Sequence, residues 1–375
     1  MRIVIFCHSL VSDWNHGNAH FLRGVTAELL ARGHDVAVYE PRGGWSRSKL
    51  VGDHGEEAVQ SVLSAFPWMD SVEYDAESLD LDAALDGTDL VLVHEWNDRD
   101  LVARIGERRN RDGATFRLLF HDTHHRAATS PDDMAAFDLS HFDGVLAFGE
   151  VIRRLYLDRG WAQRAWTWHE AADARVFKPQ EPEGALEDLV WIGNWGDGER
   201  ERELEEFLLQ PVHRLGLRGT IHGVRYPGRA ERAIRQAGLE YGGWLANHRA
   251  PEAFARHRVT VHVPRRPYVE HLPGIPTIRP FEAMACGIPL VCSPWEDAEG
   301  LFRAGSDYLV ARDGAEMAAH LRAITTDDEL AASLRASGLE TIRARHTCAH
   351  RVDELMAVAD ELGVAPEPVA AGGAA

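Results

Sequence analysis

Residues 276–292 read Pro276-Thr-Ile-Arg-Pro-Phe-Glu-Ala-Met-Ala-Cys-Gly-Ile-Pro-Leu-Val-Cys292, and this stretch decides the fold. Residues 281–286 favour a helix, and Gly287 can end it in the left-handed conformation that glycine adopts at little cost. The apolar run that follows is typical of a buried parallel strand. Glu282, in the first turn of the predicted helix, has two interpretations: it stabilises the helix through the macrodipole, or it binds a ligand.

The segment Arg279-Pro-Phe-Glu-Ala-Met-Ala-Cys-Gly-Ile-Pro-Leu-Val291 resembles the nucleotide-sugar motif of GT-B glycosyltransferases, in particular the group-1 and CgeB-like enzymes. The resemblance implies that Glu282 binds the ribose hydroxyls of a sugar nucleotide, since a carboxylate can accept two hydrogen bonds from a vicinal diol. Group-1 retaining enzymes usually carry a second glutamate eight residues earlier, where this chain has Gly274. This departure favours the CgeB-like branch.

Length and composition predict a two-domain cytoplasmic protein. The chain has 375 residues, of which 45% are hydrophobic, so it can bury sizeable cores. The formal charge, 40 − 59 = −19, argues against general binding to nucleic acids or anionic membranes. Four cysteines without a CxxC pair indicate buried free thiols in a reducing compartment. No apolar run reaches about 18 residues, so no membrane span is expected.

The first half of the chain alternates between apolar runs and helical patterns. Apolar runs occur at residues 3–7, 36–39, 90–93, 116–120 and 144–148. Such alternation predicts an α/β fold with a doubly wound parallel sheet, whose ligands bind beyond the carboxyl ends of the strands. Together with the resemblance, it predicts the GT-B fold, in which two Rossmann-like doubly wound domains face a central cleft.

The predicted domain limits follow from composition and from a second resemblance. His169-Glu-Ala-Ala-Asp173 and Phe177-Lys-Pro179 resemble the domain-junction motif of these enzymes, and a linker rich in Pro and Glu follows. We therefore expect an acceptor domain at residues 1–180 and a nucleotide-sugar domain at 181–345. Residues 346–362 are expected to return as a helix onto the first domain, and residues 363–375 to be a disordered tail.

Two loops of the first domain carry candidate acceptor residues. The loop at residues 8–17 lacks the GxGxxG fingerprint of dehydrogenases, and the resemblance implies that it approaches the donor phosphates or the acceptor. Its candidates are Asp13, Gly17 and Asn18, with an ordinary surface loop as the alternative. After the run at 90–93, Glu95 and its neighbours offer a carboxylate, an aromatic ring and an amide for sugar recognition. The alternative there is a helix N-cap at Asn97 or Asp98.

The third loop begins His121-Asp-Thr-His-His-Arg126. Its histidines raise the question of a metal, but their spacing does not define three converging ligands, and GT-B enzymes generally need none. We therefore expect no metal and no cofactor. The resemblance implies that His121 lies beside the donor sugar and that Asp122 acts as base or orienting group. Stereochemistry stays open, because Asp122, Glu95 or Asp13 suits an inverting route, whereas His121 suits a retaining one.

The second domain carries the candidate donor residues. The predicted strand at 189–193 leads through a glycine-bearing turn into a helix, and such a turn offers free N–H groups to an anion. The predicted contacts to the donor diphosphate are Gly193, Asn194, Arg200, Arg265 and Arg279, where the alternative for each arginine is a solvated surface charge. Trp244 either stacks on the base or belongs to the core.

The sequence therefore predicts a metal-independent glycosyltransferase that moves a sugar from a UDP-, GDP- or dTDP-linked donor to an unidentified acceptor. No nucleic-acid partner is expected. Two alternatives remain open. One is a non-catalytic nucleotide- or sugar-binding protein of the CgeB-like type, and the other is a sugar-phosphate epimerase or phosphorylase on the same scaffold.

Overall fold

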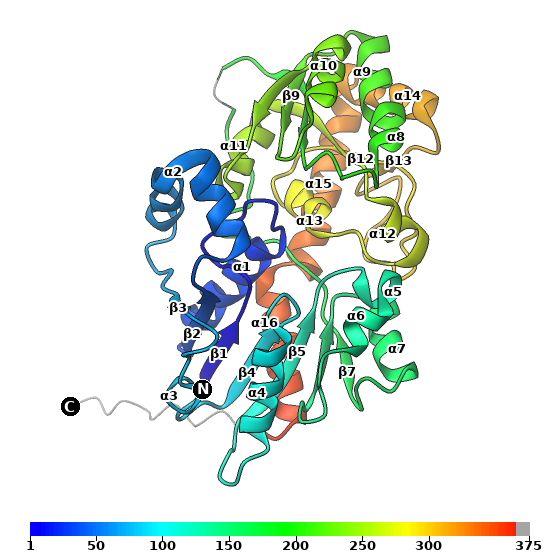
Figure 1. The fold of residues 1–375 in the computed structure, drawn as a ribbon. Helices are drawn as coiled ribbons and strands as arrows, with labels where there is room; N and C mark the ends of the chain where they lie inside the picture. Colours follow the sequence, from blue (N-terminus) through cyan, green and yellow to red (C-terminus); the bar gives the residue numbers. More distant parts are fainter. Residues whose placement is uncertain (183, 365–375) are drawn as a thin grey trace, which may run out of the picture.

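The structure is a computed structural model that describes residues 1–182 and 184–364. Figure 1 shows two lobes stacked one above the other, each built from a sheet with helices on its faces. We call the lobe that contains strands β1–β7 the first lobe and the lobe that contains β8–β13 the second lobe. The N-terminus lies in the first lobe.

In the described part of the chain, the first lobe holds a seven-stranded parallel sheet in the order β3-β2-β1-β4-β5-β6-β7. Its central strands are almost entirely buried, because helices cover both faces of the sheet. The strands are β1 (Arg2–Phe6), β2 (Asp35–Pro41), β3 (Val72–Tyr74), β4 (Leu90–His94), β5 (Arg117–Asp122), β6 (Gly144–Ala147) and β7 (Ala165–Thr167). The helices are α1 (Asn18–Ala31), α2 (Trp45–Ala65), α3 (Leu81–Ala84), α4 (Arg99–Arg109), α5 (Arg126–Thr129), α6 (Pro131–Ala135) and α7 (Glu150–Asp158).

The second lobe holds a six-stranded parallel sheet, counted over the described residues, in the order β10-β9-β8-β11-β12-β13. Its strands are β8 (Glu187–Ile192), β9 (Gly219–His222), β10 (Glu240–Gly243), β11 (His257–His262), β12 (Leu290–Cys292) and β13 (Leu309–Val310). Its helices are α8 (Glu201–Leu204), the π-helical turn η1 (Glu205–Leu209), α9 (Gln210–Leu215), α10 (Gly228–Ala237), the 3-10 turn η2 (Asn247–Arg249), α11 (Ala250–Ala255), α12 (Arg266–His271), α13 (Ile278–Ala285), α14 (Gly314–Thr326) and α15 (Asp328–Arg345).

The stretch that decided the fold forms the predicted elements. Helix α13 is followed by Gly287 with φ +68° and by the fully buried strand β12. The helix begins three residues earlier than predicted, at Ile278, because Pro280 is tolerated in a first helical turn, where the missing N–H has no intrahelical partner.

The last helix, α16 (Cys348–Glu361), packs against α1 of the first lobe. Val352 and Leu355 of α16 share an apolar core with Phe21 and Val25 of α1. The helices approach closely at Gly24, where an added Cβ would lie 2.4 Å from Cys348 Sγ.

The end of the described chain continues from α16. Val364 donates its N–H to the Ala359 carbonyl and is buried. Of the segment predicted to be disordered, residues 365–375 lie outside the described residues.

Candidate functional site

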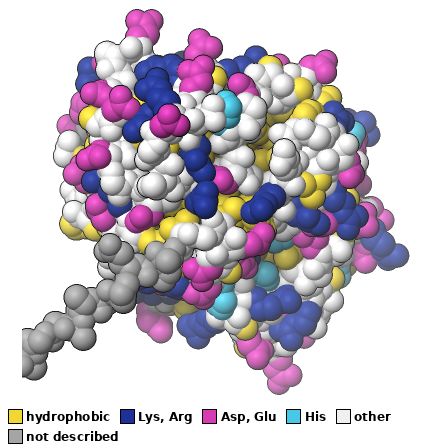
Figure 2. Space-filling view, turned by 90° about the horizontal axis from the view of Figure 1, so that it is seen from below, with side chains coloured by type: hydrophobic (Ala, Val, Ile, Leu, Met, Phe, Trp, Pro, Cys, Tyr) yellow, Lys and Arg dark blue, Asp and Glu magenta, His cyan; other side chains and the backbone are white. Residues whose placement is uncertain are grey.

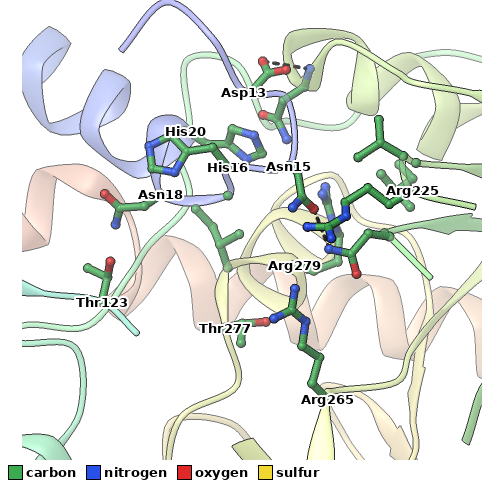
Figure 3. A pocket seen from close by; sticks show the side chains of 18 of the residues that line it. Asp13, Asn15, His16, Asn18, His20, Thr123, Arg225, Arg265, Thr277 and Arg279 are labelled. Carbon is green, nitrogen blue, oxygen red and sulfur yellow. Dashed lines mark hydrogen bonds between the residues drawn. The ribbon is translucent and has the colours of Figure 1, made fainter. Parts of the chain in front are cut away.

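A cavity of about 610 Å³ lies between the two lobes (Figure 3). Its first wall comes from the first lobe and consists of residues 8, 13, 15–18, 20, 45, 96, 123–124, 148 and 170. Its second wall comes from the second lobe and consists of residues 191–194, 197, 200, 223–225, 244–245, 247, 262, 264–265, 268 and 277–279. Most of these positions follow the carboxyl end of a strand, which is where open parallel sheets bind ligands.

Most of the predicted site residues line this cavity. On the first wall these are Asp13, Gly17 and Asn18, and on the second wall Gly193, Asn194, Arg200, Trp244, Arg265 and Arg279. Four predicted residues, Glu95, His121, Asp122 and Glu282, do not line it. Each of the four side chains is at most 1% exposed, so the structure places them beneath the surface of the site.

Four arginines line the second wall: Arg200, Arg265 and Arg279, which the sequence singled out, and Arg225, which pairs with Asp197 at 3.2 Å. Arg265 forms an ion pair with Glu199 at 3.1 Å, and Arg279 forms one with Glu282 at 2.6 Å. Arg200 is buried and donates to the Val263 and Asn194 carbonyl oxygens at 3.0 and 2.6 Å, so backbone oxygens hold it in place. Burial, together with the charge of Arg265, lowers the pKa of Arg200 to about 10, which still leaves it cationic at neutral pH.

Two helix N-termini reach the same cavity. Gly17 precedes α1 and Thr277 precedes α13, and neither helix has an acidic residue in its first turn or a side-chain cap. The partial positive charge of these termini is therefore left for a ligand. Arg279, in the first turn of α13, adds a full positive charge beside one of them.

Backbone strain in the described residues concentrates at this cavity. The non-glycine residues with positive φ are Asn15, Asp197, Arg225 and Thr277, and all four line it. Thr277 is strained, because φ +61° and ψ 178° belong to a region that is essentially restricted to glycine. Such strain costs about 1–3 kcal/mol per residue and persists where surrounding structure enforces it, which is typical of ligand sites.

Glu282 lies directly behind the second wall and connects the two lobes. Its Oε1 lies 2.8 Å from His20 Nδ1 and accepts from Asn247 Nδ2 at 3.3 Å, while Oε2 accepts from Arg279 at 2.6 Å. Burial raises the pKa of Glu282, but the charges of Arg279 and His20 and the hydrogen bonds from His20 and Asn247 together outweigh it, so the pKa lies below its usual value. Glu282 is therefore an anion whose three partners all line the cavity.

Further polar contacts join the lobes around the cavity. Asp13 accepts from Arg23 at 2.9 Å and from the Asn247 backbone N–H at 3.3 Å, and Asn194 donates to Asn15 at 2.5 Å. Trp244 stacks on His54 of α2 with ring centroids 4.8 Å apart. One face of Trp244 is therefore covered by the first lobe.

The residues predicted from the third loop lie under the first wall. His121 packs against Trp168 and Phe21, and burial lowers its pKa to about 3. Asp122 accepts from Tyr156 Oη at 2.8 Å, and burial raises its pKa. These two neighbours point to opposite faces of β5, as successive strand residues do, and neither face opens to the cavity.

Glu95 and its neighbours form hydrogen bonds that hold the loops after β4 and β5 in place. Glu95 accepts from Arg126 at 2.7 Å and from the Thr123 backbone N–H at 3.1 Å. The N-cap alternative is confirmed for Asp98, whose carboxylate accepts from Asp100 and Leu101 at the start of α4.

The first wall carries exposed aromatic rings, of which the sequence singled out only the ring beside Glu95. Trp45 and Trp96 are 44% and 40% exposed, and His8 lies between them with ring centroids 6.3 and 6.5 Å away. Trp96 also stacks beneath Arg126, whose guanidinium carbon lies 4.1 Å from the ring centroid. Burial lowers the pKa of His8, and that of His16 even further, so this wall has neutral rings where the second has cations.

Glu170, which follows β7, is another lining residue that the sequence gave no reason to choose. It is 7% exposed, and burial raises its pKa to about 8. The nearby charge of Glu282 raises the pKa further, whereas Asn18 and Arg279 lower it. The junction motif that contains Glu170 was interpreted as structural, so chemistry at this position went unnoticed.

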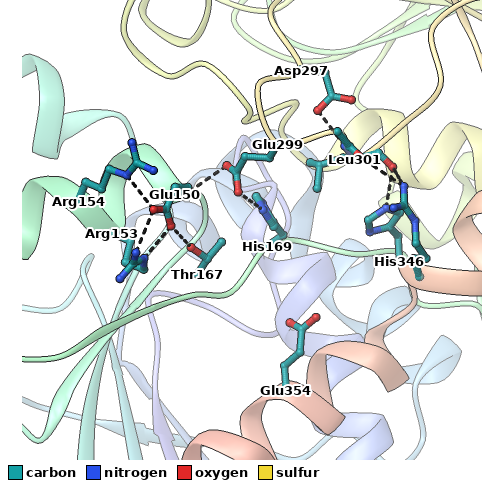
Figure 4. Close-up of polar contacts among 12 residues, drawn as sticks. Glu150, Arg153, Arg154, Thr167, His169, Asp297, Glu299, Leu301, His346 and Glu354 are labelled. Carbon is teal, nitrogen blue, oxygen red and sulfur yellow. Dashed lines mark hydrogen bonds and ion pairs between the residues drawn. The ribbon is translucent and has the colours of Figure 1, made fainter.

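A steric reason explains why position 274 holds glycine and not the second glutamate of the group-1 enzymes. Gly274 has φ +91°, and an added Cβ would lie 2.7 Å from Glu299 Cγ. Glu299 fills this space and crosses to the first lobe, where it accepts from the Glu150 N–H and lies 2.9 Å from His169 Nε2 (Figure 4). A side chain at position 274 would displace this contact between the lobes.

The described residues hold neither a metal-binding cluster nor a membrane-spanning helix. Residues 1–182 and 184–364 contain no cluster of three or more His, Cys, Asp or Glu side chains that could hold a metal ion. None of the helices among them is long and apolar enough to cross a membrane. The face of the molecule seen from below carries acidic and basic side chains intermixed (Figure 2).

Comparison with known proteins finds similarity in part of the sequence and in the fold. Residues 200–357 match the model of a family described as glycosyl transferase-like. The two facing parallel sheets are the GT-B fold, which confirms the predicted fold class. The matched segment includes residues 279–291, whose resemblance to the nucleotide-sugar motif predicted such a match. No curated protein sequence matches the chain.

Several solved structures share the fold of nearly the whole chain. A sucrose-phosphate synthase from Thermosynechococcus elongatus has a TM-score of 0.66 and 16% identity, with 98% of this chain and 100% of that chain covered. An alpha-glucosyltransferase in complex with UDP-glucose and DNA has a TM-score of 0.70 and 12% identity, with 96% and 99% covered. Phage T4 BGT in complex with its UDP-glucose substrate has a TM-score of 0.60 and 12% identity, with 96% and 100% covered. Because one of them holds DNA, the expectation of no nucleic-acid partner stays a prediction.

Proposed function

We propose that this protein is a glycosyltransferase that binds a nucleoside-diphosphate sugar in the cavity and transfers the sugar to an acceptor held on the first wall. The observation that carries the proposal is the cluster of Arg200, Arg265 and Arg279 on the second wall beside the N-termini of α1 and α13. In a chain with a formal charge of −19, this local cationic surface suits a diphosphate. A cavity of about 610 Å³ also lies within the usual range for small-molecule sites.

In this proposal Arg279 exchanges its ion-pair partner Glu282 for the diphosphate of the donor. Arg279 now neutralises Glu282, and an entering diphosphate offers the guanidinium a second anion in reach. When Arg279 turns to the phosphate, Glu282 Oε2 becomes available to a ribose diol, and Oε1 stays fixed by His20 and Asn247. Arginine and helix termini then stabilise the leaving diphosphate, so no metal ion is required and chelators leave the activity unchanged.

The nucleotide is proposed to be UDP. Two of the structurally similar glycosyltransferases hold UDP-glucose, and Trp244 and Asn247 of the second wall offer a ring and an amide for the base. On the first wall, exposed Trp45 and Trp96 present the flat apolar surface on which sugar rings or other cyclic acceptors pack.

The proposal is tested by binding first and turnover second. Thermal shift is measured with UDP, GDP, dTDP, ADP and CMP, and we expect UDP to raise the melting temperature most, because binding to the folded state stabilises it. Release of UDP from UDP-glucose is then measured with the full-length protein in the presence of EDTA.

The outcomes separate the candidate functions. Stabilisation by a nucleotide together with UDP release supports the transferase. Tight nucleotide binding without turnover on any acceptor, water included, supports the non-catalytic binding protein instead. If none of the five nucleotides stabilises the protein, the assignment of the second wall to the donor is wrong.

A further inference from the structure

Three acidic residues line the cavity in the described part of the chain, and two of them are engaged in ion pairs. Asp13 pairs with Arg23 at 2.9 Å, and Asp197 pairs with Arg225 at 3.2 Å. Glu170 is the third, and the described residues provide no ion-pair partner for it. A carboxyl group that faces the reaction space without a fixed cation is free to exchange a proton.

The surroundings of Glu170 place it where the two walls meet. Asn18, at the start of α1 on the first wall, lies near enough to lower its pKa. Glu282 and Arg279 of α13 act on it electrostatically from the second lobe, as does Tyr268 of α12. The carboxyl group thus lies between the helix terminus proposed to bind the donor and the wall proposed to bind the acceptor.

We propose that Glu170 is the general base of the transfer reaction, an inference that rests on the proposed function. The acceptor hydroxyl oxygen forms a bond to the anomeric carbon of the donor sugar, while the bond from that carbon to the β-phosphate oxygen breaks. The bonding electron pair leaves with the nucleoside diphosphate. The hydroxyl proton passes to the Glu170 carboxylate, which releases it to solvent after the products leave.

The chemistry of the group fits this role. Burial, reinforced by Glu282, holds its pKa at about 8, although Asn18 and Arg279 oppose the shift. A base is most effective when its pKa lies near the working pH, because it then combines basicity with a useful ionised fraction. Of the other candidates, His121, Asp122 and Glu95 do not line the cavity, and Asp13 is held in an ion pair with Arg23.

The test is the pH profile of UDP release from UDP-glucose, with water as acceptor, measured between pH 5.5 and 9.5. For the wild type, kcat/KM should fall about tenfold per pH unit below pH 8, because the protonated carboxyl cannot accept a proton. Glu170→Gln should lower kcat by about 100-fold or more and remove this dependence, while UDP still raises its melting temperature. Glu240→Gln, which changes an exposed carboxylate on β10, is the matched control.

The outcomes distinguish this inference from the proposed function. If the wild type releases UDP and Glu170→Gln keeps the rate and the pH profile, Glu170 is not the base, but the transferase stands. A wild type that binds UDP and never releases it from UDP-glucose contradicts both. Should Glu170→Gln not fold, Glu170→Asp replaces it, with a reduced rate and a retained pH dependence expected, whereas an unchanged rate overturns the inference.

Discussion

The two walls of the cavity differ in charge and in backbone strain. The second wall has Arg200, Arg265 and Arg279 and most of the strained residues, whereas the first wall has exposed tryptophans and neutral histidines. The pKa shifts agree with this division. Burial lowers the pKa of Arg200 only to about 10, so Arg200 stays cationic, whereas burial lowers the pKa of His16 well below its usual value and keeps that ring neutral.

The difference in charge between the two walls suits two substrates of different chemistry. A diphosphate makes the same electrostatic demand in every donor, so a wall built for it needs cations at fixed positions. A neutral acceptor is recognised through ring faces and a few hydrogen bonds. If this account is right, substitutions on the two walls should have separable effects.

The largest effect is expected where the walls are joined. Glu282→Ala leaves Arg279, His20 and Asn247 without their shared acceptor, and removing one partner of a buried pair costs about 3–5 kcal/mol. The free energy of unfolding, measured with urea, should fall by this amount, and UDP binding should be lost. Glu240→Ala should change it by less than about 0.5 kcal/mol. A loss below about 1 kcal/mol for Glu282→Ala would show that this junction is not needed for the fold.

The next effect is a pH-dependent difference in stability between Glu170→Gln and the wild type. Its pKa is about 8 in the folded protein and about 4.3 in an unfolded chain, so the folded state holds the proton more tightly. Stability from this group is therefore full below about pH 4.3 and is lost as the pH rises towards 8. The melting temperature of Glu170→Gln relative to wild type should rise between pH 5 and pH 9. A constant difference over this range, as expected for Glu240→Gln, would mean that Glu170 is ionised throughout.

A direct comparison of the walls uses one substitution on each. Arg265→Ala removes a charged donor worth about 1.5–3 kcal/mol and should weaken UDP binding about 10- to 100-fold in calorimetry. Trp45→Ala should leave the Kd for UDP within about twofold while it lowers transfer to acceptors. Equal losses of UDP affinity in both variants would contradict the assignment of the donor to the second wall and the acceptor to the first.

The smallest effect concerns strain. Thr277→Gly relieves a conformation that costs about 1–3 kcal/mol, and this gain offsets the roughly 1 kcal/mol that glycine loses through chain entropy. The melting temperature should therefore stay equal or rise, whereas the affinity for UDP falls because the start of α13 is less fixed. Thr115→Gly, at an exposed loop position with ordinary φ, should be destabilising. Equal destabilisation of both variants would argue that Thr277 stores no strain.

The long apolar runs made the central part of the fold predictable. Strands β1, β4, β5 and β6 are buried on both faces, so each appears as an uninterrupted apolar segment. The short strands β3, β7 and β10 were not predicted. They lie at the edges of their sheets and have three or four residues each, and β10 contains two glycines, so no apolar pattern marks them.

Sequence reasoning located the strand ends but not the direction of the side chains beyond them. His121 and Asp122 occupy the end of β5, and the sequence does not show that helices cover both faces there. Glu282 pairs with His20, which is 262 positions away, so its burial follows from the meeting of the lobes. Glu170 went unnoticed for the same reason, because its neighbours Asn18 and Tyr268 come from distant parts of the chain.

The most direct measurement is a crystal structure of the protein with UDP bound. We expect the diphosphate between Arg265, Arg279 and the N-terminus of α13, with the ribose beside Glu282. UDP on the first wall, or outside the cavity between the lobes, would contradict this expectation.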